Sequence, residues 1–246
     1  CDLTDTVRHM AEIHLPSKTM TAVLGRVMCG ASLIGSLLKN KEDSLTLRID
    51  GDGPAGKIIC VSDYLGNVRI CADHYGVELP PNASGKLDVG GAVGRGTLYV
   101  IRDLGLAEPY IGSAALVSGE IAEDITNYFA ASEQTPTVCA LGVRADTEKR
   151  CIAAGGYLVQ LLPGADEGIV PALERNMSSM ESVSKLIKDG VSGEEIVARV
   201  FDGIPFDLFD KFECGYVCSC SRERYLSALR GLPRADIDEM KADGQP

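Results

Sequence analysis

The chain has no tryptophan among its 246 residues, and aromatic residues make up only 5% of it. Aliphatic side chains must therefore form the core, and a hydrophobic content of 45% is enough for a sizeable one. Long apolar runs are also missing, because the longest uncharged apolar stretch covers residues 27–38. A bilayer helix needs about 20 apolar residues, so the sequence predicts no membrane-spanning segment. It shows no secretory signal pattern either.

Basic residues are scarce as well. The chain has 24 Lys and Arg against 35 Asp and Glu, which gives a net charge of −11. A nucleic-acid-binding face needs clustered cations to neutralise phosphates, so the composition argues against nucleic acid as a partner. The acidity itself identifies no ligand, because net charge also serves solubility.

Cysteine, in contrast, is abundant, with nine residues. Five of them stand in mostly apolar surroundings: Cys29, Cys60, Cys71, Cys139 and Cys151. We expect these five to be buried small hydrophobic residues of a protein from a reducing compartment. The chain begins at Cys1 rather than at a methionine, and we expect it to be part of a longer polypeptide.

Hydrophobic periodicity divides the chain into helices, a mixed β region and helices again. Helical spacing predicts helices over residues 4–14 and 20–38, and Gly25, Gly30 and Gly35 of the second helix indicate close packing. Alternating apolar residues predict strands over residues 44–50, 56–61, 67–72, 97–104, 110–118, 138–145 and 150–162, with one helix over 120–131. Helices return over residues 166–180, 182–189 and 192–201, the last with Ser192 and Glu195 as a capping box. This order indicates an α+β fold, with a mixed β core and packed helices.

The stretch GDGPAG, from Gly51 to Gly56, matches the dinucleotide-binding pattern G-x-G-x-x-G and follows a predicted strand. Asp73 stands at about the distance expected for a ribose contact. However, the pattern needs a helix that begins at the loop and holds the pyrophosphate, whereas strand-like sequence follows here. Pro54 also removes one backbone N–H. We therefore favour a turn between antiparallel strands, and a dinucleotide-binding enzyme remains the alternative.

Two further patterns lack the partners that their chemistry requires. The glycine-rich residues 90–96 do not end in the Lys-Ser/Thr pair of a P-loop, which favours a structural loop. The three histidines, His9, His14 and His74, show no metal-ligand spacing. Cys71 and His74 could form a nucleophile and base, but the sequence shows no group to orient them.

The stretch YVCSCSRERY, residues 216–225, carries the most distinctive pattern. Cys218 and Cys220 lie among polar and charged residues, before a helix expected near residue 222 with Ser221 as its N-cap. The helix dipole and two nearby arginines favour the thiolate form of both side chains. Thiolates bind zinc or react with oxidants, and two of them form half of a four-ligand zinc site, with Cys214 as a possible third. A disulfide between residues this close would be easily reduced; the alternative is a pair of ordinary thiols.

Several longer stretches resemble one family. They are GDGPAGKI, GKLDVGGAVGRGTLYVIRDLG, VSGEIAEDITNYFAASEQTPT, AAGGYLVQLLPGA and CSCSRERYLSALRGL. Together they cover nearly the whole chain in order, and they are similar to the bacterial redox-regulated heat-shock chaperone family HslO, the 33-kilodalton heat-shock protein. The resemblance implies a cytoplasmic, ATP-independent holdase that binds unfolding client proteins under oxidative stress, and not an enzyme.

The resemblance also implies a switch. In that family, a C-x-C pair and a later C-x-x-C pair hold one zinc ion per subunit in the reduced, inactive form. Oxidants form two disulfides and release the zinc, the zinc domain and the preceding linker unfold, and the active form is a homodimer. Cys218 and Cys220 match the C-x-C pair, both as metal ligands and as redox-active disulfide residues. Cys214 lies outside the ligand set of the family.

The chain departs from the family pattern at both ends. The C-x-x-C pair is missing, and we expect it beyond Pro246; the first strand region is expected before Cys1. The resemblance divides the chain into a core chaperone domain over residues 1–176 and a helical linker over 177–213. Residues 214–246 are expected to be the first half of the redox-switch zinc-binding domain, which is truncated here.

Overall fold

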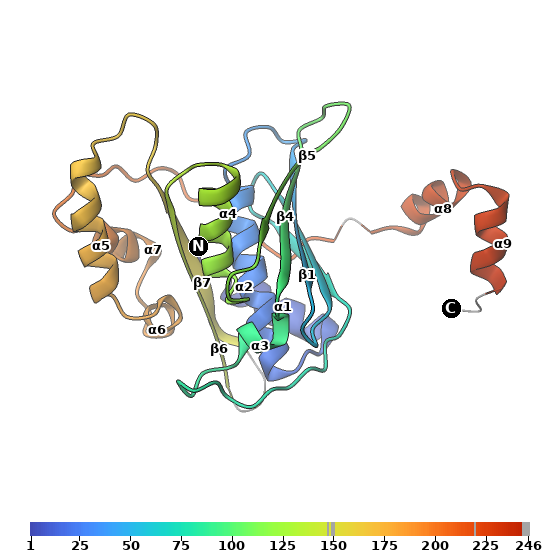
Figure 1. Cartoon of the computed structure of the whole chain (residues 1–246), viewed down its shortest axis with the longest axis horizontal. Helices are drawn as coiled ribbons and strands as arrows, with labels where there is room; N and C mark the ends of the chain where they lie inside the picture. The colour runs from blue at the N-terminus through green and yellow to red at the C-terminus, as the bar shows by residue number, and fades with distance from the viewer. Residues whose placement is uncertain (147, 149–150, 219, 243–246) are drawn as a thin grey trace. The chain divides into compact units, whose positions relative to one another are not determined.

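A computed structural model describes residues 1–146, 148, 151–218 and 220–242 of the chain (Figure 1). The contacts divide it into two compact units, Cys1–Tyr216 and Val217–Pro246. The first unit contains both β-sheets and most of the helices. Within its described residues, the second unit contains two short helices, α8 (Arg222–Arg230) and α9 (Arg234–Ala242).

The first unit begins with the helices α1 (Thr4–His14) and α2 (Lys18–Gly35). Ser17 caps α2, because its hydroxyl accepts a hydrogen bond from the backbone N–H of Met20 at 3.0 Å. Nearly all residues of α2 are buried. The reason is its position between the two sheets, both of which it contacts (Figure 1).

The larger sheet is antiparallel and has the strand order β3-β2-β1-β4-β5. Its strands are β1 (Ser44–Gly51), β2 (Lys57–Asp63), β3 (Val68–Ala72), β4 (Gly96–Asp103) and β5 (Tyr110–Ala115). The smaller sheet is the antiparallel pair β6 (Thr137–Ala145) and β7 (Cys151–Gln160). The α+β class predicted from the sequence is therefore confirmed.

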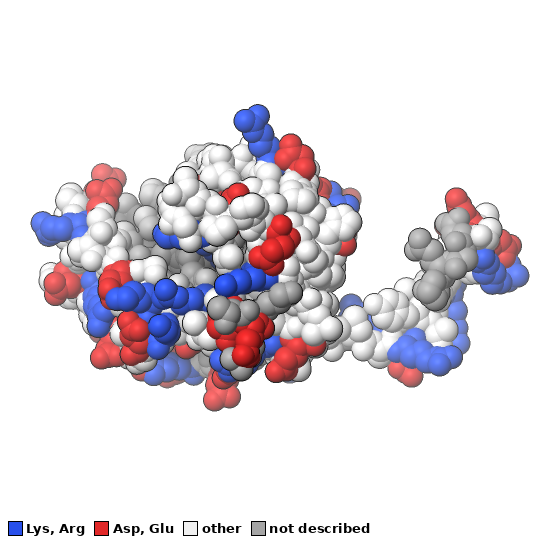
Figure 2. Space-filling model, turned by 90° about the horizontal axis from the view of Figure 1, so that it is seen from below, with Lys and Arg blue, Asp and Glu red and all other residues white. Residues whose placement is uncertain are grey.

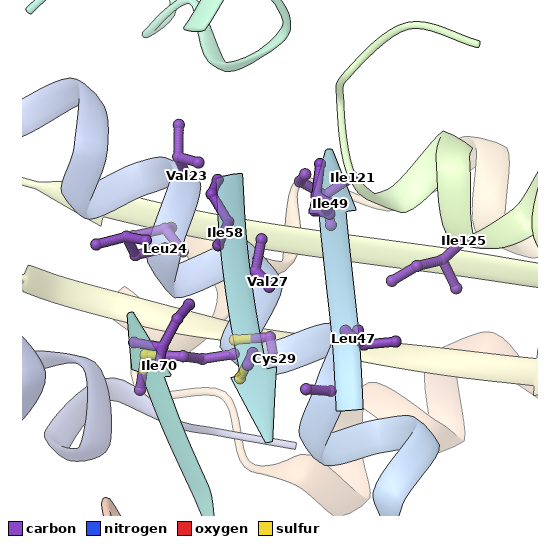
Figure 3. Packing of buried hydrophobic residues seen from close by; sticks show 14 of the residues in the cluster. Val23, Leu24, Val27, Cys29, Leu47, Ile49, Ile58, Ile70, Ile121 and Ile125 are labelled. Atoms are coloured by element: carbon purple, nitrogen blue, oxygen red, sulfur yellow. The ribbon is translucent and has the colours of Figure 1, made fainter. Parts of the chain in front are cut away.

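The core lies between α2 and the larger sheet. Alternation in β1 buries Leu45, Leu47 and Ile49, as the sequence predicts. Figure 3 shows the α2 side chains Val23 and Val27 beside Ile58 of β2, with Leu47 and Ile49 of β1 in the same cluster. Aliphatic groups make up most of this cluster, consistent with the lack of tryptophan.

The remaining helices cover the sheets or follow the last strand. They are α3 (Val89–Val93), α4 (Ala122–Ser132), the 3-10 turn η1 (Glu167–Ile169), α5 (Val170–Ser179), α6 (Val183–Lys188) and α7 (Gly193–Val200). The predicted capping box of α7 is present, since the Ser192 hydroxyl and the Glu195 carboxylate each accept a backbone N–H of the other residue. Helix α6 packs on both strands of the smaller sheet.

Two sequence predictions about elements need correction, and one helix was missed. The glycine-rich residues 90–96, expected to be a loop, lie partly in α3, which the Asp88 carboxylate caps through the Gly91 N–H at 2.9 Å. Helix α9 was not predicted, and α2 ends at Gly35 rather than at Leu38. Helices as short as α3 and α9 leave only a weak periodic signal in the sequence.

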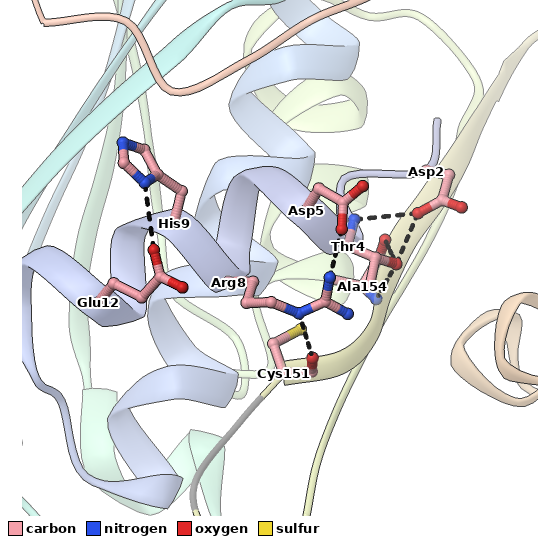
Figure 4. Close-up of polar contacts among 8 residues, drawn as sticks. All are labelled: Asp2, Thr4, Asp5, Arg8, His9, Glu12, Cys151 and Ala154. Carbon is pink, nitrogen blue, oxygen red and sulfur yellow. Dashed lines mark hydrogen bonds and ion pairs between the residues drawn. The ribbon is translucent and has the colours of Figure 1, made fainter.

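Helix α1 is attached to β7 through side-chain to backbone hydrogen bonds (Figure 4). The Thr4 hydroxyl accepts the Ala154 N–H at 3.1 Å and donates to Asp2 at 2.6 Å. The Arg8 Nε donates to the Cys151 carbonyl at 3.4 Å. These contacts hold α1 beside the smaller sheet.

Every helix within the described parts of the chain falls short of the length or the apolar character that crossing a membrane requires. The longest, α2, is nevertheless almost completely buried. Its apolar surface is used to pack the two sheets together, which explains the hydrophobic run seen in the sequence.

Candidate functional site

The C-x-C pair lies in the second unit. Cys218 and Cys220 are both exposed. Ser221 caps α8 as predicted, since its hydroxyl accepts the Arg224 N–H at 3.1 Å. The pair therefore immediately precedes a helix N-terminus, where the backbone dipole favours negative charge.

Tyr225 of α8 contacts the pair. The Tyr225 hydroxyl donates a hydrogen bond to the Cys220 sulfur at 3.6 Å. This hydrogen bond raises the pKa of Tyr225 above its usual value. No sequence pattern marks this tyrosine apart from its position five residues after Cys220, about one helical turn into α8.

The donor set of the pair suits zinc in kind but not in number. Thiolates are ligands that zinc prefers, and a structural zinc site takes four of them or their equivalents. Within residues 1–146, 148, 151–218 and 220–242, no group of three or more His, Cys, Asp or Glu side chains is placed to hold a metal. Among the described residues, Cys218 and Cys220 thus offer two thiols, which are too few to complete a four-ligand site.

The segment before the pair, Cys214–Tyr216, is attached to the edge of the larger sheet. The Gly215 carbonyl accepts the Val68 N–H of β3 at 2.9 Å, and the Gly215 N–H donates to the Asn67 side chain at 2.9 Å. Tyr216 forms an isolated parallel bridge with Val68. The first unit thus ends on the outer edge of β3, directly before the C-x-C pair in sequence.

Tyr216 connects this edge with α1. Its hydroxyl lies 2.8 Å from His14 Nε2 and donates to the Ile70 carbonyl of β3 at 3.3 Å. The His14 ring stacks on Tyr75 with centroids 4.8 Å apart, and His9 meets the Tyr216 ring edge-on at 5.9 Å. Burial lowers the pKa of His14 below its usual value. Sequence reasoning missed this cluster because its members are far apart in the chain.

Cys214 is half-buried, and its environment differs from that of the exposed pair. Its thiol forms a hydrogen bond with Ser32, and its carbonyl accepts the Thr6 hydroxyl at 3.3 Å. Burial raises the pKa of Cys214 above its usual value. The residue therefore has a packing role at the end of α2 in the first unit.

The segment 201–213, which precedes Cys214, leaves large apolar side chains in contact with water. Phe209 is 89% exposed, Leu208 54% and Phe212 53%. Together with α2 and α7, this segment lines a cavity of about 560 Å³, and Lys211 forms an ion pair with Glu194 of α7. Exposed apolar groups in one short segment are typical of an interaction surface.

Most of the other cysteines are buried, as predicted. Cys29, Cys60, Cys139 and Cys151 are buried, and burial raises the pKa of Cys139 to about 12 and that of Cys151 to about 11. Such thiols react poorly at neutral pH because the thiolate is the nucleophile. The prediction was wrong for Cys71, which is exposed because the alternation of β3 turns it away from the core face that holds Ile70.

The pairing of Cys71 with His74 is not supported. Both residues are exposed, and the hydrogen bonds found among the described residues do not join them. A nucleophile needs a base within hydrogen-bond reach. The structure therefore does not bring a thiol hydrolase site together.

The Gly51–Gly56 loop is the turn that joins the antiparallel strands β1 and β2. A strand, β2, begins at Lys57, so no helix N-terminus is available for a pyrophosphate. Asp73 has a structural role, since its carboxylate accepts the Lys57 N–H at 2.8 Å and lies against Gly56, whose φ is +69°. The alternative of a dinucleotide-binding enzyme loses its site.

Comparison with known proteins agrees with this reading of the fold. The family described as "Hsp33 protein" matches residues 1–246. The 33 kDa chaperonin of Ruminiclostridium cellulolyticum is 45% identical over 242 residues, which cover 98% of this chain and 82% of the relative. The 33 kDa chaperonin of Desulforamulus reducens is 44% identical over 237 residues, covering 96% and 80%.

A solved structure is similar along the same length. The crystal structure of the 33 kDa chaperonin (heat shock protein 33 homolog) of Thermotoga maritima superposes with a TM-score of 0.88 at 36% sequence identity. The match covers 99% of this chain and 83% of that protein. Sequence and fold therefore agree, and the chain belongs to the Hsp33 family of chaperones.

Proposed function

We propose that this protein is a redox-regulated, ATP-independent holdase of the cytoplasm, which binds unfolding proteins under oxidative stress and dimerises when active. The observation that carries the proposal is the order of two features along the chain near the C-x-C pair. An exposed pair of thiols follows a segment with exposed phenylalanines, in a chain of a chaperone family. Thiol chemistry and an apolar surface are thus only a few residues apart.

The second unit is suited to respond to the state of its thiols. Helices α8 and α9 bury none of their described side chains. A unit without a core needs another source of folding free energy, and a metal provides it in small modules. Cys218 and Cys220 would supply two of the thiolates that hold a zinc ion in the reduced full-length protein. A disulfide between them would take these two ligands away.

The apolar segment is the part that would respond to this change. Residues 208–212 line the cavity of about 560 Å³ beside α2 and α7. Few hydrogen bonds hold this segment, apart from its attachment at Cys214–Tyr216. Release of the attachment would add the apolar lining of the cavity to the side chains that are already exposed, and apolar surface of this kind binds unfolded chains.

The proposal is tested by light scattering of a heat-denatured client protein. The full-length protein is added in its reduced form and after oxidation with peroxide at raised temperature. After oxidation, the protein concentration required to suppress aggregation should be at least about tenfold lower. The reason is that oxidation shifts the population toward the state that binds client proteins. Equal suppression by both forms would leave a constitutive binding protein and contradict redox control.

The role of the pair is tested by the zinc content of the reduced full-length protein. The substitution Cys218→Ser should lower it, because loss of one of four ligands weakens a tetrahedral site strongly. Cys71→Ser is the matched control, since Cys71 is an exposed thiol of the first unit. Unchanged zinc stoichiometry in the Cys218 variant would exclude Cys218 as a ligand.

A further inference from the structure

A cavity of about 470 Å³ in the first unit has an unusual charge. Among the residues that line it, five are cations and none is an Asp or Glu; the cations are Lys18, Arg26, Lys86, Arg144 and Lys185. In a chain with a net charge of −11, chance alone would place more carboxylates than cations here. Figure 2 shows one face of the protein, on which Lys and Arg side chains form a group with Asp and Glu around it.

The cations come from separate elements that the fold brings together. Lys18 and Arg26 belong to α2, Arg144 to β6 and Lys185 to α6, and Lys86 lies in the loop before α3. Close packing makes this possible. A side chain on Gly142 of β6 would lie 2.8 Å from the backbone N of Ser184, so only glycine lets α6 approach β6 this closely.

Carboxylates neutralise only part of this charge. Arg26 forms an ion pair with Glu120, and Lys185 pairs with Glu181 and lies 3.8 Å from Asp189. The ion pairs found among the described residues include none for Lys18, Lys86 or Arg144.

Three further details point to a missing negative charge. Glu78 is close to Lys18, but its carboxylate accepts the Lys18 backbone N–H at 3.0 Å and the Thr19 hydroxyl at 3.2 Å. Arg144 and Lys185 are near enough to repel each other. In addition, the buried Arg26 Nε has no hydrogen-bond partner among the described residues. Cations gathered in one cavity repel one another, and a bound anion would offset that repulsion.

The shape and lining of the cavity indicate which anion fits. Its volume lies in the range of small-molecule sites, about 300–1,000 Å³, and exceeds what a single phosphate fills. Arg and Lys are the residues that recognise phosphate oxygens. The apolar part of the lining is aliphatic and includes no aromatic ring on which a base would stack.

We propose that this cavity binds a linear oligophosphate of about two or three phosphate units, either free or as the phosphate chain of a nucleotide. The site goes beyond the proposed redox function and uses none of its cysteines. It has one structural consequence. Lys185 lies on α6, within the predicted linker, whereas the other four cations lie before residue 150. A bound oligophosphate would therefore join α6 to the rest of the first unit and stabilise this arrangement.

The test is isothermal titration of the full-length protein with sodium triphosphate at low ionic strength. The variant is the double substitution Lys86→Gln and Arg144→Gln; both side chains are exposed, so the fold should be retained, which circular dichroism checks. The matched control is Lys188→Gln, which removes an exposed lysine of α6 that does not line the cavity. We expect saturable binding that is at least about tenfold weaker in the double variant and unchanged in the control.

Further arms identify the source of the phosphate. If ATP binds as tightly as triphosphate, the site recognises the phosphate chain alone and not the nucleoside. Binding of ATP without binding of triphosphate overturns the proposal, and so does binding of hexaglutamate in its place. An equal loss in the Lys188 control and in the double variant would show non-specific attraction and contradict a site. A melting temperature that rises with triphosphate in the wild type but not in the double variant gives independent support.

Discussion

At the scale of single residues, the hydroxyl group of Tyr216 connects two elements of the first unit. It contacts His14 of α1 and the Ile70 carbonyl at the edge of β3. An edge strand exposes backbone groups that need partners, and a second tyrosine, Tyr75, serves the same edge by accepting the Ala72 N–H at 3.1 Å. Tyr216, two positions before Cys218, therefore holds the end of the first unit against the sheet.

Replacing Tyr216 with phenylalanine should destabilise the folded protein by about 1–2 kcal/mol. The change leaves His14 Nε2 and the Ile70 carbonyl without this partner while it keeps the ring, and each lost hydrogen bond costs about 0.5–1.5 kcal/mol. Urea unfolding of the full-length protein measures the difference. Tyr110→Phe is the control, since it removes the hydroxyl of an exposed tyrosine. Equal midpoints for Tyr216→Phe and the wild type would show that the contact contributes nothing.

His14 should make stability depend on pH. Burial lowers its pKa in the folded protein below the ordinary value of 6.5, so between these two values the unfolded chain binds a proton that the folded chain does not. Stability then falls as the pH falls through this window. The urea midpoint should drop between about pH 7.5 and pH 5.5, and the drop should be smaller in His14→Gln.

The control for this pH effect is His74→Gln, which replaces an exposed histidine and should keep the drop of the wild type. The readout is the change of the midpoint with pH rather than its absolute value, because His14→Gln also loses the contact with Tyr216. A wild-type protein whose midpoint is the same at both pH values would contradict the prediction, and so would a drop that His14→Gln retains in full.

At the scale of elements, sequence patterns correctly predicted the features that depend on neighbouring residues. The cap at Ser221, the capping box at Ser192 and the alternation of β1 each depend on residues a few positions apart, and all three are present. Contacts between residues far apart in the chain could not be predicted from such patterns. His14 and Tyr216 are 202 positions apart, and neither shows a pattern that marks the other.

The cationic cavity was hidden for a related reason. Its members are scattered singly along the sequence, and the overall charge is negative, so composition suggested the opposite of a basic site. Burial of Cys71 was predicted from its apolar neighbours, but the alternation of an edge strand decides which face a side chain occupies. The exposed C-x-C pair was found because its two cysteines are separated by a single residue, which is the case that sequence patterns detect best.

The close approach of α2 to β2 gives a prediction for Gly35. A Cβ atom there would lie 2.8 Å from the Asp63 carbonyl oxygen and still closer to the Ser62 hydroxyl. Gly35→Ala should therefore destabilise the protein by about 1–3 kcal/mol, since overpacking forces the backbone to shift. Gly193→Ala, in α7, is the control because a Cβ at that position meets open space. Urea unfolding compares the two, and an equal stability of both variants would contradict tight packing at Gly35.

At the scale of the whole molecule, the two units differ in what stabilises them. The first contains the core between the sheets, whereas the helices of the second bury no described side chain. Local stability follows buried apolar contacts. Any chemical change at Cys218 and Cys220 should therefore act first on the second unit, then on the segment 201–216 that precedes it, and last on the sheets.

Limited trypsin digestion of the full-length protein tests this order. Oxidation should speed cleavage after Lys211 and within α8 by at least about tenfold, because loss of local structure raises the population of open, cleavable states. The sheets should survive as a fragment that contains α1 to β7. Cys71→Ser should retain the acceleration, since its thiol belongs to the first unit, whereas Cys218→Ser should abolish it. Cleavage within the sheets at the same rate as after Lys211 would mean that oxidation unfolds the protein globally, and the hierarchy of the two units would then be wrong.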